Sequence, residues 1–352
     1  MRLLDLCDIK YGYAFDSKRF TDNPIYPPLV RIRDVKRGFS ETFYAGEYSK
    51  EYLLHKGDLL IGMDGEFNIA RWKSVDALLN QRVCKISAKK GTNEEYIRFA
   101  LSKKLKNIED KTSFVTVKHL SARELSTIEF TMPEYEKQRK IADILVSIEN
   151  IIEKKKQELE QLDTFVKSRF AEMFGNPLNG TAKYPIHQVG EVANSVDPQP
   201  SHRTPPVEED GVPYVSIKDC DYKTGKIDFE GARKVSPKVL EEHLNRYTLH
   251  EGDFVIGKIG TIGNPVFIPA RDDYTLSANI VLVQPNRELV SPYFLKYSFE
   301  SDFVERQFAE AKNSTSQAAF GIQKVRTVKV MNPDLDVQNK FENFVQQVDK
   351  SK

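Results

Sequence analysis

The stretch His-Lys-Gly-Asp-Leu-Leu-Ile-Gly at residues 55–62 returns later in the chain as His-Glu-Gly-Asp-Phe-Val-Ile-Gly at residues 250–257. A further glycine follows each copy three residues later, at Gly65 and Gly260. Two stretches that share a charged turn, an apolar run and the same glycine spacing are hard to obtain by chance. They indicate an internal duplication, which has to be recognised before a fold is assigned.

The similarity extends to both sides of these two stretches in the same order. The parallels pair residues 28–34 with 213–219, residues 79–83 with 276–280, and residues 120–138 with 320–338. The repeat therefore covers nearly all of the 352 residues, a length that suits two domains. A repeating unit this long is a duplicated domain and not one turn of a solenoid.

Within each unit, hydrophobic periodicity separates strands from helices. Short β-branched and aromatic runs bounded by Gly, Pro and Asn predict strands at residues 59–61, 83–86, 254–256, 280–283 and 325–330. Residues 93–106 and 292–311 are predicted to be helical. Each unit is therefore expected to be a mixed α and β domain, and the predicted fold class is α+β.

Residues 138–174 differ from the rest because they contain no Gly or Pro and are rich in Glu, Lys, Gln, Leu and Ile. We predict one helix of about 55 Å. Its apolar residues follow a coiled-coil spacing, which predicts a subunit interface. The predicted interface residues are Leu145, Ile148, Ile152, Leu159, Leu162, Val166 and Met173.

A second, shorter helix is predicted from Gln338 to the last residue, Lys352. Because the second unit connects the end of the first helix to the start of this one, we expect the two helices to pair antiparallel. This pairing would place Phe341, Phe344, Val345 and Val348 against the stretch around Leu159, Leu162, Val166 and Met173. It would leave Leu145, Ile148 and Ile152 without a helical partner from the same chain.

Composition and charge narrow the class of protein. Hydrophobic residues make up 40% and charged residues 29% of the chain, as in globular proteins. No apolar stretch reaches the roughly 18 residues that span a bilayer, and no signal peptide is evident, so we expect a cytoplasmic protein. The net charge is +1, but residues 1–132 hold 23 basic and 18 acidic residues, whereas residues 181–332 hold 18 and 20. Any site for a polyanion is therefore local.

Signals of catalysis or metal binding are missing from the sequence. Asn-Pro-Pro-Tyr and a glycine-rich adenosyl-methionine loop do not occur. Residues 252–259 approach a phosphate-binding loop, but Ile259 replaces the required hydroxyl residue and the intervening residues form an apolar strand. The histidines lack metal-ligand spacing, and Cys7, Cys84 and Cys220 are too far apart for a zinc motif. We expect a binding protein without cofactor or metal.

Both units run into a segment of the form I-x-[FV]-x-x-P-x-x-x-x-Q or a close variant, followed by a helix. The first is Ile-Glu-Phe-Thr-Met-Pro-Glu-Tyr-Glu-Lys-Gln at residues 128–138. Together with the Gly-Asp strands at residues 57–62 and 252–263, this resembles the specificity subunit of type I restriction-modification enzymes. The resemblance implies target-recognition domains at 1–132 and 176–332, a central spacer helix at 133–175 and the start of a second spacer helix at 333–352.

The resemblance also implies a function. Such a subunit is not catalytic; each recognition domain reads one half of a bipartite double-stranded DNA target. The helices set the separation of the halves and bind methyltransferase subunits, two in number, through which restriction subunits join. No membrane is involved. A net charge near zero is compatible with this role if the partners supply much of the phosphate contact.

Polar and basic residues in loops beside the shared strands are the candidates for DNA contact, because sequence is read by side chains that reach the groove edges. In the first domain they are Arg31, Arg33, Lys36, Arg37, Arg71, Lys73 and Lys118. In the second they are Lys218, Lys258, Asn264, Lys312, Asn313, Ser314, Thr315 and Gln317.

Two other functions fit parts of the sequence. A scaffold whose duplicated domains bind protein, with the helix as a dimerisation rod, would also explain the repeat. Binding to DNA that depends on sequence and salt would separate it from a DNA reader. A self-contained modification enzyme is opposed by the missing methyl-donor motifs, and binding of adenosyl-methionine by the isolated chain would favour it.

Overall fold

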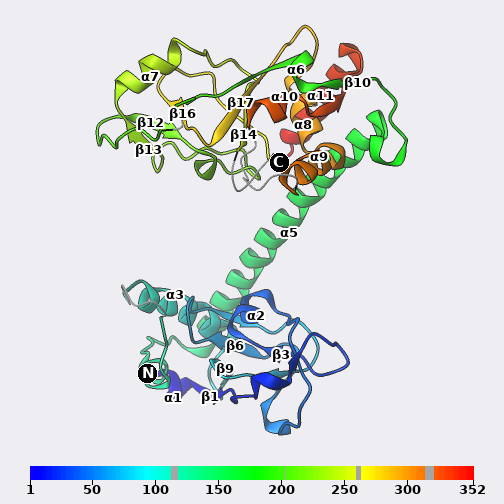
Figure 1. Ribbon diagram of the computed structural model, residues 1–352. Helices are drawn as coiled ribbons and strands as arrows, with labels where there is room; N and C mark the ends of the chain where they lie inside the picture. The colour runs from blue at the N-terminus through cyan, green and yellow to red at the C-terminus, as the bar shows by residue number, and fades with distance from the viewer. Residues whose placement is uncertain (112–117, 202, 259–262, 314–320) are drawn as a thin grey trace. The chain divides into compact units, whose positions relative to one another are not determined.

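A four-stranded antiparallel sheet with the same topology forms the centre of each of two units, Met1–Lys155 and Lys156–Lys352. The computed structural model describes residues 1–111, 118–201, 203–258, 263–313 and 321–352 (Figure 1). The boundary between the units falls inside a long helix. The matching sheets express the duplication in the sequence.

In the first unit, the central sheet has the order β1-β9-β6-β7 and a second sheet the order β3-β8-β5. The strands are β1 Cys7–Tyr11, β2 Phe20–Thr21, β3 Leu29–Val30, β4 Phe43–Tyr44, β5 Leu53–Leu54, β6 Leu59–Gly62, β7 Ile69–Arg71, β8 Ala77–Leu79 and β9 Val83–Ala88. The helices are α1 Leu3–Leu6, α2 Ile32–Arg37, α3 Glu94–Lys111 and α4 Ala122–Thr127, with short 3₁₀ turns η1 Ser17–Arg19 and η2 Lys50–Tyr52.

In the second unit, the central sheet has the order β11-β17-β14-β15 and the second sheet the order β13-β12-β16. The strands are β10 Ile186–Gln188, β11 Ala193–Val196, β12 Val212–Val215, β13 Arg233–Val235, β14 Phe254–Gly257, β15 Val266–Phe267, β16 Thr275–Leu276, β17 Ile280–Pro285 and β18 Lys329–Met331. The helices are α6 Val189–Val192, α7 Pro237–Leu244, α8 Pro292–Phe299, α9 Asp302–Asn313, α10 Ile322–Arg326 and α11 Leu335–Asp349, with 3₁₀ turns η3 Pro177–Asn179 and η4 Ile217–Asp219.

The repeated His-x-Gly-Asp stretch is a turn that starts the central strand of each unit. The Asp58 carboxylate accepts a hydrogen bond from the His55 backbone N–H at 2.8 Å, and Asp253 accepts the corresponding bond from His250 at 2.9 Å. Local bonds of this kind from an aspartate to nearby backbone stabilise turns. These repeated residues are therefore structural, and they position β6 and β14 identically.

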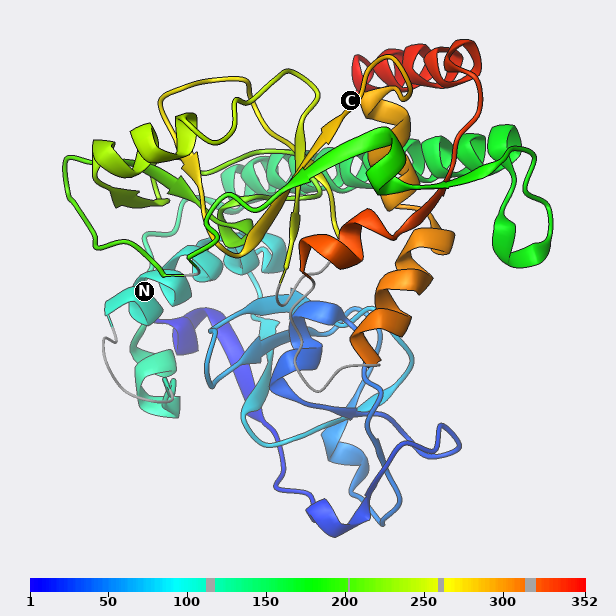
Figure 2. The same cartoon turned by 45° about the horizontal axis from the view of Figure 1, so that its top comes forward.

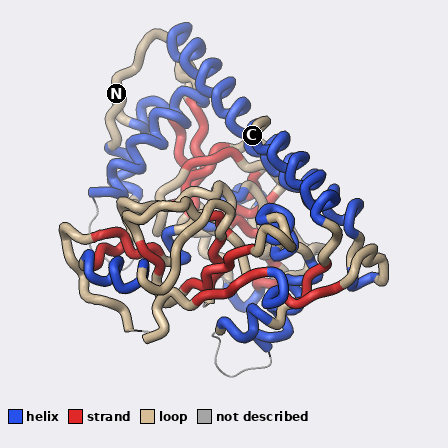
Figure 3. The backbone as a smooth tube through the Cα atoms, turned by 90° about the horizontal axis from the view of Figure 1, so that it is seen from above, coloured by secondary structure: helices blue, strands red, loops and turns tan. Residues whose placement is uncertain are grey.

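The long helix, α5, runs from Tyr135 to Phe174 and joins the two units (Figure 3). Its 40 residues confirm the single helix predicted from the sequence. In the first unit, Gln138 is buried: its Oε1 accepts from Asn93 N at 2.9 Å and its Nε2 donates to Pro133 O at 2.8 Å. Because Asn93 caps the start of α3, this glutamine ties the beginning of α5 to the domain beside it.

The same arrangement recurs where α11 begins. Gln338 is fully buried, its Oε1 accepts from Ser291 N at 2.7 Å, and its Nε2 donates to Pro333 O at 2.7 Å. Ser291 caps α8 through a bond from Phe294 N to its hydroxyl. Figure 2 shows α11 (red) beside α8 (orange). We call this pair of contacts, made by Gln138 and Gln338, the glutamine clips.

The Gln338→Leu variant should lower the free energy of unfolding of the second unit by about 2–4 kcal/mol. It leaves the buried Ser291 N–H and Pro333 carbonyl without their partner, and each unsatisfied group costs about 1–3 kcal/mol. Urea denaturation followed by circular dichroism measures the loss. The control is Gln347→Leu on the exposed side of α11, which should change stability by less than about 0.5 kcal/mol. Equal stability of the two variants would show that the clip contributes nothing.

The C-terminal part of α5 packs against α11 within the second unit, in the predicted antiparallel direction. Val166, Phe170 and Phe174 share one core with Phe341, Val345 and Val348. The ring centroids of Phe170 and Phe341 are 5.3 Å apart and those of Phe165 and Phe344 are 5.2 Å apart. Beyond them, Lys352 Nζ lies 2.8 Å from Asp163 Oδ1. Leu162 and Met173 pack against this core, but Leu159 is exposed and lies outside the predicted pairing.

Two predicted elements differ from the structure. The helix expected at residues 292–311 is two helices, because Ser301 ends the first and caps the second through bonds from Val304 N and Glu305 N to its carbonyl. The strand expected at residues 325–330 begins as helix α10, which inserts Val325 into the core, and only its end forms β18. At residues 325–327, tertiary packing of Val325 outweighs the local β-branched pattern.

Candidate nucleic-acid interface

Helix α2 presents a group of exposed cations on the first unit. Arg33 Nη2 donates to Thr42 Oγ1 at 3.3 Å, Lys36 Nζ lies 2.8 Å from Glu66, and Arg37 Nη2 lies 3.1 Å from Glu41. The bond from Lys36 holds the pKa of the Glu66 carboxyl below its usual range. Ion pairs this exposed contribute little to stability, so the cations can exchange their partners for phosphate oxygens. We call Arg33, Lys36 and Arg37 the α2 cluster.

The α2 helix is positioned by a buried carboxylate at its start. Asp34 accepts hydrogen bonds from Arg31 N and Ser40 Oγ, both at 3.0 Å. In the second unit, Asp219 accepts the equivalent bond from Ser216 N at 2.8 Å. The framework is thus shared, whereas the exposed side chains beside it differ between the units.

A second polar cluster lies where β6 ends. His119 Nδ1 contacts the Asp64 carboxylate, Arg82 Nη1 lies 3.2 Å from the His119 ring nitrogens, and Arg82 Nε lies 3.5 Å from Asp64. Arg82 and His119 come from separate turns and both are about half exposed, at 51% and 44%. Asp64 is more buried, with a side chain 20% exposed, and it contacts both Arg82 and His119. We call these three residues the Arg82 cluster.

Two of the predicted contacts in the first unit have internal partners instead. Arg71 donates to Gly57 O at 2.6 Å and to Glu94 at 3.0 Å, and it also pairs with Glu95. Lys118 Nζ donates to Glu109 O at 2.6 Å, near the end of α3. Both side chains hold neighbouring elements together, so they are less available for DNA contact than the exposed cations. Arg31 and Lys73 are exposed and remain candidates.

In the second unit, Lys258 lies inside the domain. Its side chain is 6% exposed and its Nζ lies 2.8 Å from Asp197 Oδ1, so the cation is used inside the domain. Lys218 is exposed on η4 and Asn264 is half-buried. The backbone of Lys312 and Asn313 forms the end of α9. Ser314, Thr315 and Gln317 lie outside the described residues.

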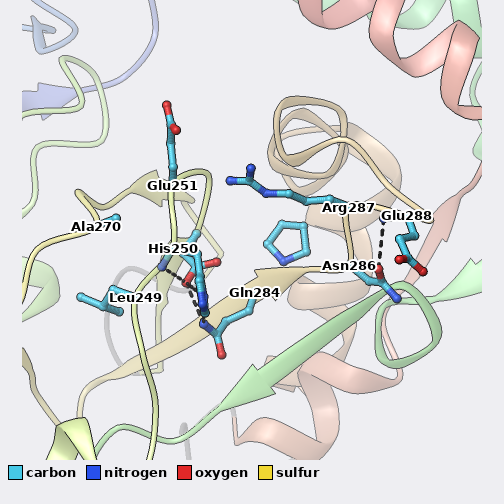
Figure 4. A pocket seen from close by; sticks show the side chains of 10 residues that line it. Leu249, His250, Glu251, Ala270, Gln284, Asn286, Arg287 and Glu288 are labelled. Carbon is cyan, nitrogen blue, oxygen red and sulfur yellow. Dashed lines mark hydrogen bonds and ion pairs between the residues drawn. The ribbon is translucent and has the colours of Figure 1, made fainter.

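An open hollow of about 700 Å³ lies at the start of β14 in the second unit (Figure 4). The Asp253 carboxylate beneath it accepts from His250 N and, at 2.7 Å, from Gln284 Nε2. Burial raises the pKa of Asp253 above its usual range. The lining also contains Glu251, Arg287 and Glu288, a mixed set of charges. Its polar groups stabilise the turn and do not form a site for a polyanion.

The cysteines have no role as reactive thiols. All three are buried, and burial raises the pKa of Cys7 and Cys84 to about 12 and that of Cys220 to about 11. At neutral pH they remain neutral thiols, which neither attack nor bind metals well. Among the described residues, no group of three or more His, Cys, Asp and Glu is arranged to hold a metal ion.

The middle of α5 carries apolar side chains with no cover in the described part of the chain. Ile148 and Ile152 are 47% and 51% exposed, and Ile144 and Ile151 are exposed beside them. Leu145 is half-buried. We call Ile144, Ile148, Ile151 and Ile152 the α5 seam. An exposed run of four isoleucines on one helix marks an interaction surface.

The model of the type I restriction modification DNA specificity domain matches residues 1–162 and 206–352. The chain belongs to this family. The two matched segments correspond to the two copies of the repeat. As a type I specificity protein, the chain serves in selecting DNA targets and is not the catalytic subunit of its system.

Relatives of this specificity protein carry the same description. The chain is 26% identical to the type I restriction enzyme EcoBI specificity subunit of Escherichia coli, over 97% of this chain and 77% of the relative. It is 21% identical to the MjaVIII specificity subunit of Methanocaldococcus jannaschii, over 92% and 79%. The solved S subunit of the type I restriction-modification system from M. genitalium has the same fold, with a TM-score of 0.57, 14% identity and coverage of 100% and 89%.

Sequence reasoning missed the Arg82 cluster of this specificity protein. A signal was present, because residues 79–83 align with residues 276–280 and place Arg82 opposite Asn279, two unlike polar residues. A difference between exposed polar residues inside a shared framework is a feature of binding surfaces. No helix among the described residues is long and apolar enough to cross a membrane.

Proposed function

We propose that each unit reads one part of a split DNA target, and that α5 fixes the spacing between the two parts. The target-recognition domains are residues 1–132 and 176–332, with residues 133–175 as the spacer and 333–352 as a second helix that stabilises it. The single observation that carries this proposal is the shared framework with unequal exposed side chains. Two like frameworks suit one kind of ligand, and unlike side chains suit two different sequences.

The beginning of α2 illustrates this point. Arg31 and Ser216 occupy equivalent positions, each with its N–H bound to the carboxylate three residues later. Arg33 and Lys218, both exposed, are also equivalent. Arginine donates two hydrogen bonds to guanine more readily than lysine does. Serine, in contrast, can form hydrogen bonds with several different bases. The two units therefore recognise different half-sites.

The spacer has the stiffness that a fixed separation requires. A continuous helix of 40 residues is about 60 Å long, more than one 34 Å turn of DNA. The first glutamine clip and the ion pair between Arg98 and Glu149, at 2.6 Å, fix its first half to the first unit. The α5 seam is the proposed contact with methyltransferase subunits, two per complex, through which restriction subunits join. The complex acts on cytoplasmic DNA.

Selection from random-sequence DNA tests this function. The chain assembled with its methyltransferase subunits should enrich a motif of two short conserved parts separated by unspecified bases of constant number. The affinity should fall steeply with salt, because phosphate contacts release counterions. Enrichment of no motif would favour the alternative, a protein-binding scaffold with a helical dimerisation rod.

Alanine variants of Lys36 and Arg37 separate base contacts from phosphate contacts in the α2 cluster. If the side chain contacts a base, the variant should lose about 1–3 kcal/mol and relax one target position. If it contacts phosphate, the variant should bind all sequences more weakly and the salt slope should decrease by about one. Binding titrations of the assembled complex at several salt concentrations measure both effects. Lys90→Ala, at an exposed lysine after β9, is the control, and variants that behave like it would exclude the α2 cluster from the interface.

A further inference from the structure

The two units share one more framework, the tight turn that leads into the longest central strand. In the first unit, Val83 N donates to Asn80 O at 3.2 Å across this turn. In the second unit, Ile280 N donates to Ser277 O at 3.3 Å. The turns connect β8 to β9 and β16 to β17, so they lie at equivalent places in the two domains.

Both turns are held to the neighbouring strand by the same backbone bond. Arg82 O accepts from Met63 N at 2.9 Å, and Asn279 O accepts from Lys258 N at 2.8 Å. The N–H of the preceding residue is bound as well: Gln81 N donates to Tyr13 O at 2.8 Å, and Ala278 N donates to the Tyr214 hydroxyl at 3.2 Å. The backbone of each turn is therefore rigid.

Rigid turns in the two units carry different exposed side chains, Arg82 in the first and Asn279 in the second. These are the two residue types that make the best paired hydrogen bonds to bases in the major groove. Arginine donates to O6 and N7 of guanine, and asparagine pairs with N6 and N7 of adenine.

Arg82 shows two further marks of a functional residue. Its φ of +69° is the only left-handed value among the non-glycine residues that the structure describes. The left-handed conformation costs free energy in any residue with a Cβ atom. Backbone strain of this kind is found most often at functional sites. Its guanidinium is also held by Asp64 and His119, which fixes the fork of donors before a ligand arrives.

The sequence of the second unit does not repeat these two supporting residues. The positions that correspond to Asp64 and His119 are Ile259 and Ala319, which carry no polar group and lie outside the described residues. Asparagine needs less support than arginine, because its side chain has two rotatable bonds and a planar amide. Arg82 therefore has supporting side chains beside it, and the smaller Asn279 side chain does not require them.

We propose that Arg82 and Asn279 are equivalent base-reading residues, Arg82 for a guanine in one half of the target and Asn279 for an adenine in the other. This inference rests on the proposed function, and it assigns one residue to each half-site. Asp64 and His119 are positioning residues that act through Arg82.

The test uses the full chain assembled with its methyltransferase subunits and selection from random-sequence DNA. Arg82→Lys keeps the charge but removes the fork, and Arg82→Asn tolerates the left-handed backbone better than most residues. Each should reduce discrimination for one guanine by about 10- to 100-fold and leave the other half of the motif unchanged. Asn279→Ala should reduce discrimination for one adenine in the opposite half of the target by a similar factor.

Matched control variants distinguish a failure of this inference from a failure of the proposed function. Lys90→Ala and Arg287→Ala, exposed residues near the far ends of β9 and β17, should leave the motif intact. If the wild-type complex enriches a two-part motif and the Arg82 and Asn279 variants keep it, the assignment of these residues is overturned and the function stands. A uniform loss of affinity with unchanged motif would identify phosphate contacts and also overturn it. A wild-type complex without any motif would overturn both.

Discussion

Exchange of residues 1–132 for the corresponding domain of a relative is expected to change one half of the DNA target completely and to leave the other half unaltered. Each unit has its own central sheet, its own strand-ending turns and its own polar surface. The residues that form the α2 cluster and the Arg82 cluster all belong to the first unit. Sequencing of methylated sites in cells that express the hybrid chain measures the outcome.

A second hybrid serves as control for this exchange. Exchange of residues 1–155 also replaces the first half of α5 and keeps the Arg98–Glu149 pair within one parent. Both hybrids should recognise the same new half-site, with the same number of bases between the halves if the helix keeps its length. A change in both halves, or in neither, would contradict independent reading by the two units.

The double variant Ile148→Glu/Ile152→Glu is expected to weaken assembly with methyltransferase subunits by at least about 100-fold. Burial of one isoleucine contributes about 1.5–3 kcal/mol, so loss of two removes about 3–6 kcal/mol. Both side chains are half exposed in the chain itself, so each unit should stay folded. Analytical ultracentrifugation measures assembly, and circular dichroism checks folding. The isolated wild-type chain should also self-associate at high concentration through this seam.

The matched control is Asn150→Glu, which adds a negative charge on the opposite face of the same exposed stretch. Asn150 lies about 200° around the helix from both Ile148 and Ile152. This variant should assemble like the wild type. Normal assembly of the double variant, together with a chain that stays monomeric, would show that the α5 seam is not an interface.

Patterns within the sequence were sufficient to predict the two domains, the long helix and its pairing. The repeat predicted two equivalent domains, because a duplicated sequence folds twice into the same sheet. The heptad spacing predicted α5, since a run free of Gly and Pro has no internal stop signal. The antiparallel pairing of α5 with α11 followed from chain connectivity, and Phe170 and Phe341 confirm it.

Contacts between distant residues limited the prediction of the site. Lys258 resembled a surface cation because nothing near it in sequence neutralises it, whereas its partner Asp197 lies far away along the chain. The ion pairs of Arg71 were equally hidden in the sequence, because Glu94 and Glu95 meet it only after folding. The Arg82 cluster brings three turns together, and no local pattern encodes that meeting.

The glutamine clips also order the events of synthesis on the ribosome. Every partner of Gln138 precedes it or lies within five residues of it, so the first unit closes as soon as the start of α5 has emerged. Phe170 and Phe174 are made long before Phe294 and Phe341, which cover them. The second unit, in contrast, cannot close until Gln338 arrives. During that interval a finished first domain is followed by a nascent helix whose aromatic rings are uncovered, and exposed apolar surface of this kind favours aggregation.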